Sequence, residues 1–131
     1  MKYLDRRSIS CYTKATKEVL ALSITADLIR GHTETIILAQ LMRGDTYGYE
    51  INKTVRRISD SRYELKEATL YSAFRRLEDT GQIESYWGGE ATGARRRYYR
   101  ITPLGRQTYA QQIELWEEAK SIIDKLIETE A

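Results

Sequence analysis

The 131-residue sequence predicts a mainly α-helical protein with one small β-hairpin. Three observations support this fold class. Apolar residues recur at three- and four-residue spacings through most of the chain, which is typical of amphipathic helices. Two short segments between residues 82 and 101 alternate in polarity like strands, and a glycine-rich turn separates them.

A first helix is predicted from Ser23 to Met42, because apolar residues recur at helical spacing on both sides of Gly31. The segment 43–46 contains a glycine that ends this helix. Either Asp45 or Thr46 can then cap the next helix with its side-chain oxygen.

The second helix is predicted at about Tyr47 to Ile58, with Ile51, Val55 and Ile58 directed inward. Residues 62–65 alternate briefly and are interpreted as a short strand. The third helix is predicted at about Glu67 to Thr80.

The inner stripe of the third helix consists of Leu70, Phe74 and Leu77, and Gly81 ends it. Strands are expected at 82–87 and 96–101, with an exposed turn at 88–94 between them.

The only proline, Pro103, suits the first turn of a last helix that runs to about Glu128. Three helices, a hairpin and a long helix, in this order, indicate a winged helix-turn-helix followed by a C-terminal dimerisation helix. We therefore divide the chain into a basic N-terminal extension at 1–22, a DNA-binding domain at 23–102 and the dimerisation helix at 103–131. For the extension, a flexible arm that touches phosphates and a frayed end without a role both stay open, and the second is favoured.

The composition of the chain excludes several classes of function. The apolar fraction is 41%, the charged fraction 31% and the net charge only +2, so the whole sequence reads as a soluble globular protein. Cys11 is the only cysteine and His32 the only histidine. No metal-ligand spacing, phosphate-binding glycine loop, secretory signal or membrane span is visible. We expect a cytoplasmic protein that is not an enzyme and uses no metal or cofactor.

The outer side of the third helix carries the first candidate binding residues. With the apolar stripe directed inward, Thr69, Ser72, Arg75 and Arg76 lie on the outside or flank. Arginine can form two hydrogen bonds to the major-groove edge of guanine, and hydroxyls can contact bases or phosphates. A merely solvated helix face explains the same residues about equally well.

The hairpin favours DNA contact. Arg95, Arg96, Arg97 and Arg100 lie within six positions. Strand geometry places Arg95 and Arg97 on one face and Arg96 and Arg100 on the other. Phosphates or a narrow minor groove would attract such arginines. Charge that protects an exposed hairpin edge is the alternative.

The last helix has a broad apolar arc, wider than one small domain needs to cover. Pairing with a second copy across a two-fold axis is favoured over packing within the chain. A two-fold axis could bring two Trp116 indoles together around a flat apolar ligand. From spacing alone, a tryptophan that is simply packed in the interface is favoured over such a slot.

Several motifs together resemble the PadR family of transcriptional regulators, from about residue 24 onward. The single C-terminal helix is similar to the PadR subfamily that lacks a larger C-terminal domain, which includes multidrug-binding repressors. These motifs are Tyr47-Gly48-Tyr49-Glu50-Ile51, Glu67-Ala68-Thr69-Leu70-Tyr71, Arg76-Leu77-Glu78, Gly93-Ala94-Arg95-Arg96-Arg97-Tyr98-Tyr99 and Ile101-Thr102-Pro103-Leu104-Gly105.

The resemblance implies a homodimeric repressor that binds double-stranded DNA at an inverted repeat, with the third helix in the major groove and the wing along the backbone or minor groove. It also implies that Tyr47 and Tyr71 anchor the DNA. Lys66 stands at the N-cap of the third helix, where Asn, Ser or Asp would cap better, and a phosphate contact would explain it.

In drug-binding relatives, the resemblance further implies, a tryptophan stacks on planar apolar or cationic small molecules between the subunits. The matching positions here are Trp116, Ile113, Lys120, Leu28, Gly31, Thr35 and Leu38. The alternative function is a small-molecule-binding or protein-interaction dimer with little sequence-specific DNA binding.

Overall fold

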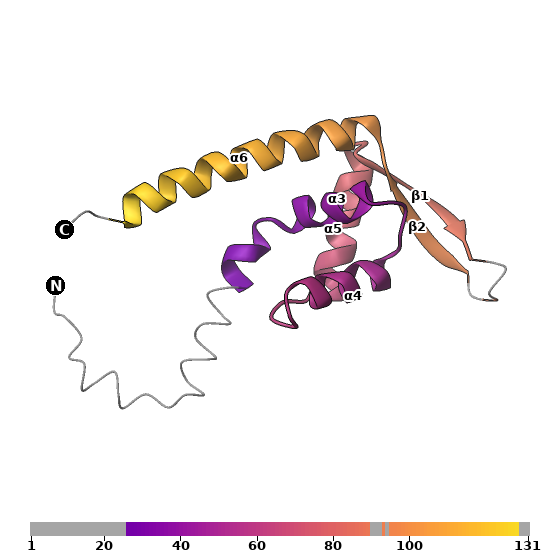
Figure 1. Cartoon of the computed structure of the whole chain (residues 1–131). Helices are drawn as coiled ribbons and strands as arrows, with labels where there is room; N and C mark the ends of the chain where they lie inside the picture. Colours follow the sequence, from indigo (N-terminus) through magenta and orange to yellow (C-terminus); the bar gives the residue numbers. More distant parts are fainter. Residues whose placement is uncertain (1–25, 90–92, 94, 129–131) are drawn as a thin grey trace, which may run out of the picture. The chain divides into compact units, whose positions relative to one another are not determined.

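The structure is a computed structural model that describes residues 26–89, 93 and 95–128 (Figure 1). It confirms the predicted fold class of helices with one antiparallel hairpin. The elements are α3 (Thr33–Met42), α4 (Gly48–Ile58), α5 (Glu67–Asp79), β1 (Ile83–Gly88), β2 (Arg96–Ile101) and α6 (Pro103–Ile127).

The chain divides into two compact units between His32 and Thr33. Of the first unit, residues 26–30 are helical and 31–32 form a turn that the His32 amide closes on the Ile29 carbonyl at 2.8 Å. The predicted single helix from Ser23 to Met42 is therefore wrong, because the chain leaves the helix at Gly31, which has a poor helix propensity. The extension at 1–22 lies outside the described residues.

In the second unit, the core joins α3, α4, α5 and the hairpin. Its buried apolar residues are Ile37, Leu38, Leu41, Ile51, Val55, Leu65, Leu70, Ala73, Phe74, Leu77, Ile83, Tyr99 and Ile101. The predicted inner stripe of α5 is confirmed. Ile58, also predicted to face inward, is 57% exposed. Ile58 is the last residue of α4, so no further turn of this helix packs beside its side chain.

The turn between α4 and α5 sets the position of α5. Asn52 fixes it, since its side-chain amide accepts from the Leu65 N–H at 2.8 Å and donates to the Leu65 carbonyl at 2.9 Å. The turn itself contains two left-handed residues, Asp60 and Ser61. The short strand predicted at 62–65 is absent from this described turn, because a side chain and not a neighbouring strand satisfies the Leu65 backbone.

The start of α4 also differs from the prediction. Neither Asp45 nor Thr46 caps this helix; Tyr47 occupies the N-cap without a side-chain hydrogen bond. Asp45 instead accepts a hydrogen bond from the Tyr86 hydroxyl at 2.6 Å. The Thr46 backbone pairs with Tyr99 in an isolated antiparallel bridge. The chain before α4 is thus attached to the hairpin.

The hairpin strands agree with the prediction to within one residue at each end. Their register runs from the pair Ile83–Ile101 to the pair Gly88–Arg96. The exposed turn predicted at 88–94 falls largely on residues outside the described ones, but its described Gly93 is exposed and has a φ of 77°.

The first turn of α6 is tightly joined to the hairpin, and Pro103 lies there as predicted. The Thr102 hydroxyl donates to the Gly81 carbonyl at 2.6 Å and accepts from the Gly105 amide at 3.1 Å. A Cβ atom at Gly105 would lie only 2.1 Å from the Gln82 carbonyl oxygen. This close approach between helix and strand therefore requires glycine.

The rest of α6 is largely exposed. Tyr109 is the last residue of this helix that packs against the core, and from Ala110 to Ile127 only Ala119 is half-buried. Figure 1 shows α6 as one continuous helix, in orange to yellow. Its large exposed apolar residues beyond Tyr109 are Ile113, Leu115, Trp116, Ile122, Ile123, Leu126 and Ile127. None of the helices in the described part of the chain has the length and apolarity to cross a membrane.

Candidate nucleic-acid interface

The outer side of α5 carries the exposed polar residues that helix geometry predicts. Ser72 and Arg75 are exposed, and Thr69 is half-buried. Tyr71 is 55% exposed while its ring makes an edge contact with Phe74 beneath it. Because Phe74 is buried in the core, this contact joins the outer side of α5 to the core.

Arg76 is engaged differently from Arg75. Its Nε donates to Glu34 Oε1 on α3 at 2.7 Å, with both side chains about half exposed. Arg75 instead lines a hollow next to the hairpin. The two neighbouring arginines of α5 therefore face different elements: Arg76 faces α3, and Arg75 faces the hairpin. Their adjacent positions in the sequence do not predict this difference.

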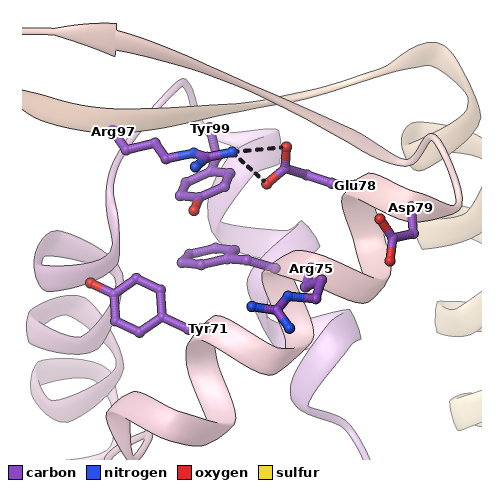
Figure 2. Close-up of a pocket in the computed structure, with 7 residues that line it drawn as sticks. Tyr71, Arg75, Glu78, Asp79, Arg97 and Tyr99 are labelled. Atoms are coloured by element: carbon purple, nitrogen blue, oxygen red, sulfur yellow. Dashed lines mark hydrogen bonds and ion pairs between the residues drawn. The ribbon is translucent and has the colours of Figure 1, made fainter.

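The hollow lies between α5 and the hairpin, or wing, and has a volume of about 280 Å³ (Figure 2). We call it the α5–wing hollow, and its lining residues are Tyr71, Phe74, Arg75, Glu78, Asp79, Arg97 and Tyr99. The Phe74 and Tyr99 rings stack with their centroids 3.8 Å apart, which joins α5 to β2 beside the hollow. The Arg75 and Arg97 side chains thus come from two elements to one concave surface.

Within this hollow, Arg97 is held by α5 and β1 together. Its Nη2 donates to the Ser85 hydroxyl at 2.8 Å and lies 3.4 Å from both carboxylate oxygens of Glu78. The Ser85 hydroxyl in turn donates to Glu78 at 2.9 Å. Figure 2 shows Arg97 reaching across to Glu78.

The opposite face of the hairpin holds a cluster of tyrosines and arginines. Tyr98 contacts the Tyr47 ring edge-on at 5.3 Å and stacks on Tyr86 at 5.7 Å. The guanidinium of Arg96 lies 4.8 Å from the centre of the Tyr47 ring, and that of Arg100 lies 5.2 Å from the centre of Tyr86. The division of the arginines between two faces is as predicted, whereas the tyrosine cluster was not predicted, since Tyr47 is far away in sequence.

Two tyrosines of the hairpin, one on each face, have raised pKa values. The hydrogen bond from Tyr86 to the Asp45 carboxylate raises the pKa of Tyr86 above 10.0, because the phenolate would lose that bond and face a like charge. Burial raises the pKa of Tyr99, which is 4% exposed. Both phenols therefore stay protonated in the ordinary pH range.

The remaining DNA candidates lie at the ends of these elements. Arg95 places its guanidinium 4.8 Å from the centre of the Trp87 ring, and Trp87 is 55% exposed. Lys66 is exposed at the N-cap of α5 and gives no side-chain cap, as its residue type predicts. It adds a cation at the helix end that already favours anions.

The seven candidate ligand residues are spread over the first unit, α3 and α6, and do not line one common hollow. Leu28 and Gly31 belong to the first unit, and Leu38 and the half-buried Thr35 belong to α3. Leu38 is buried in the core. None of the seven lines the α5–wing hollow or a second hollow at the corner between α3 and α4.

The other three ligand candidates lie on the exposed part of α6. Trp116 is 41% and Ile113 37% exposed, and Lys120 forms an ion pair with Glu117 at 3.1 Å. These three residues lie on one face of the helix, because they are spaced three and four residues apart.

A helix-turn-helix whose second helix presents arginine and hydroxyl groups, next to an arginine-rich hairpin, defines a winged helix-turn-helix protein of the DNA-binding class. The comparison with family models agrees, since the PadR-like family of transcriptional regulators matches residues 37–111. The chain belongs to this family.

Known proteins show the same likeness over most of the chain. A transcriptional regulator from Clostridium thermocellum is 52% identical, with a TM-score of 0.72, over 79% of this chain and 100% of its own. A PadR family transcription regulator from Clostridium difficile is 34% identical, with a TM-score of 0.66, over 73% of this chain and 98% of its own. An uncharacterised protein from Lysinibacillus sphaericus is 42% identical over 80% of this chain and 96% of its own.

Family membership determines the general function. PadR-like proteins are DNA-binding transcriptional regulators and not enzymes. The prediction of a regulator and not a catalyst is therefore confirmed.

Proposed function

We propose that this protein is a ligand-responsive repressor that binds an inverted-repeat operator as a homodimer. In this proposal α5 enters the major groove and the hairpin lies on the adjacent backbone or minor groove. The DNA-contacting residues are Tyr47, Lys66, Thr69, Tyr71, Ser72, Arg75, Arg76, Arg95, Arg96 and Arg97.

The observation that carries the DNA-binding proposal is the α5–wing hollow, which Arg75 of α5 and Arg97 of β2 both line. A helix and a wing that present cations toward one concave surface fit the alternating grooves and strands of duplex DNA. Arg75 of α5, which is exposed, can form paired hydrogen bonds to guanine, which would supply sequence specificity.

The two candidate anchoring tyrosines lie close together at the start of α4. The Tyr71 hydroxyl is only 3.6 Å from the position that a Cβ atom at Gly48 would occupy, and Gly48 directly follows Tyr47. A hydroxyl beside a helix N-terminus is well placed to share a phosphate with the free amides there. This arrangement supports a common DNA-backbone contact for Tyr47 and Tyr71.

The exposed part of α6 supports the homodimer. Leu126 and Ile127 are each 72% exposed, and five further large apolar side chains are exposed between Ile113 and Ile123. A helix with such a face is stabilised by burying it against another helix. Two-fold pairing of α6 would also bring two copies of α5 to one duplex.

The ligand proposal centres on Trp116, whose exposed indole could stack on a planar apolar or cationic molecule between two copies. Ile113 and Lys120 lie one turn away on either side. The contributions of Leu28, Gly31, Thr35 and Leu38 rest on the family resemblance alone.

The DNA test begins with selection of duplexes from a random pool by the full-length protein. Arg75→Ala should then weaken binding to the selected duplex by roughly 1–3 kcal/mol and relax the preference at one base pair. Arg106→Ala is the matched control, because Arg106 is exposed on α6 and contacts Met42. Equal effects of the two variants would contradict the assignment of α5.

A titration of the wild-type protein with selected and random duplexes tests the alternative function. A small-molecule-binding or protein-interaction dimer would show nearly equal affinity for selected and random duplexes, whereas specific regulators differ by about 10³ or more. The recovered half-site spacing also tests the dimer.

For the ligand site, a planar cationic dye should quench tryptophan fluorescence in the wild type and in Trp87→Ala. The quenching should be absent in Trp116→Ala. Quenching that survives Trp116→Ala would place the dye elsewhere.

A further inference from the structure

The geometry of duplex DNA implies an occupant for the α5–wing hollow, and this inference rests on the proposed function. One sugar–phosphate strand separates each major groove from the adjacent minor groove. If α5 lies in the major groove and the hairpin on the adjacent minor groove, that strand must cross between α5 and β2. The α5–wing hollow occupies this position.

The hollow contains the groups that recognise a phosphate. The Arg75 and Arg97 guanidiniums can each donate two hydrogen bonds to phosphate oxygens, and Tyr71 lines the same hollow. Tyr71 and Arg75 are exposed, so both can reach a strand that lies over the hollow. The stacked rings of Tyr99 and Phe74 lie next to them.

The hollow also contains a group that opposes a phosphate. Glu78 lies 3.4 Å from the Arg97 guanidinium through both carboxylate oxygens, and its side chain is 28% exposed. Asp79 adds a second carboxylate to the lining. Because Glu78 and Ser85 both contact Nη2 of Arg97, a phosphate that takes paired hydrogen bonds from this guanidinium must compete with Glu78 for Nη2.

We propose that the α5–wing hollow is a binding site for one DNA phosphate, and that Glu78 competes with this phosphate for Arg97. Glu78 therefore lowers the affinity for DNA, although it belongs to the DNA-binding surface. The energetic scale permits the exchange, since an exposed ion pair contributes little to stability while the phosphate contact releases counterions.

The first test measures the affinity of full-length Glu78→Gln for the selected duplex by fluorescence anisotropy at moderate salt. Binding should become tighter by up to about fivefold, the range that an exposed ion pair allows. Glu84→Gln is the matched control, because Glu84 forms an ion pair with Arg100 of the same hairpin at the same distance of 3.4 Å but lies outside the hollow. An equal gain in both variants would overturn the proposal, since it would reflect only the change in net charge.

The role of Arg97 is tested by a double-mutant cycle. Arg97→Ala should weaken binding, and Glu78→Gln should give no gain when Arg97 is already alanine. If Glu78→Gln weakens DNA binding while its melting temperature stays that of the wild type, Glu78 positions Arg97 for DNA and the competition is refuted.

A measurement on the wild-type protein covers the case in which Glu78→Gln does not fold. Binding affinity is measured for a series of duplexes, in each of which one phosphate is replaced by a neutral methylphosphonate at a different position. One position should weaken wild-type binding severalfold and have a clearly smaller effect on Arg97→Ala, in which Arg75 still contacts the phosphate. The absence of any such position would overturn the phosphate site, even if selected duplexes still bind far better than random ones. Equal binding of selected and random duplexes would instead refute the proposed function itself.

Discussion

The winged-helix part of this protein and the last part of α6 contrast in how much of their apolar surface the chain itself buries. Between Thr33 and Tyr109, helices and hairpin share one core whose central residues are almost completely buried. Between Ala110 and Ile127, seven large apolar side chains remain exposed. The first region is stabilised by its own contacts, whereas the second leaves most of its large apolar side chains exposed.

The apolar residues of the two regions therefore have different roles. Residues of the first region determine the position of the DNA-binding side chains. Residues of the second region are available to another molecule, because exposed apolar surface is stabilised by burial wherever a partner is found. Substitutions of the same chemical kind should therefore have different effects in the two regions.

The largest effect is expected for Leu77→Ala. Leu77 is 0% exposed at the centre of the core, and removing such a side chain leaves a cavity as well as losing apolar burial. We expect a loss of about 2–5 kcal/mol in the free energy of unfolding, measured in urea. A loss below about 1 kcal/mol would mean that the core is less closely packed than its burial indicates.

A smaller effect is expected for Asn52→Ala, which acts within the first region without removing apolar surface. It leaves the backbone N–H and carbonyl of the buried Leu65 without their side-chain partner. We expect a loss of about 1–3 kcal/mol. The variant should also weaken DNA binding, because this turn positions α5. Unchanged stability would show that water replaces the Asn52 amide.

The next prediction concerns alkaline pH and the link between α5 and β2. The pKa of Tyr99 is raised above 10.0 in the folded state by burial, so folding favours the protonated phenol. Its contribution to stability is fully present below pH 10 and is lost as the pH rises through the raised pKa. Tyr99→Phe should make the unfolding free energy less dependent on pH above 10. Identical alkaline profiles of wild type and variant would contradict this assignment.

The smallest effect on the single chain is expected for Leu126→Ala, the counterpart of Leu77→Ala in the second region. Leu126 is 72% exposed, so the stability of an isolated chain should change by less than about 0.5 kcal/mol. If α6 pairs in solution, the variant should dissociate at higher protein concentration in sedimentation experiments. A large loss of stability that is independent of concentration would show that α6 packs within its own chain.

The sequence predicted the elements well where one local pattern was sufficient. The α5 stripe of Leu70, Phe74 and Leu77 and the alternating strands were correct, since each follows from one period of burial. The outward direction of Arg75 followed from the same stripe. Its DNA contacts remain a prediction.

The contacts that the sequence did not predict join groups that are distant in sequence. Asp45 could not be assigned to Tyr86, nor Arg76 to Glu34, because neither pair is linked by a local repeat. The strand predicted at 62–65 failed for the same reason, since Asn52 lies 13 residues from the backbone groups it satisfies. The break after Gly31 carried a local signal, the glycine itself, which the apolar periodicity outweighed.

The narrow contact between Gly105 and the Gln82 carbonyl fixes the direction in which α6 leaves the hairpin. Because α6 has 25 residues and is therefore about 37 Å long, a change of about 10° at this contact would displace its far end by roughly 6 Å. A partner that bound the far end of α6 would therefore also fix the position of the hairpin relative to that partner. In a paired molecule, the glycine at this joint would limit which separations between two half-sites can be spanned.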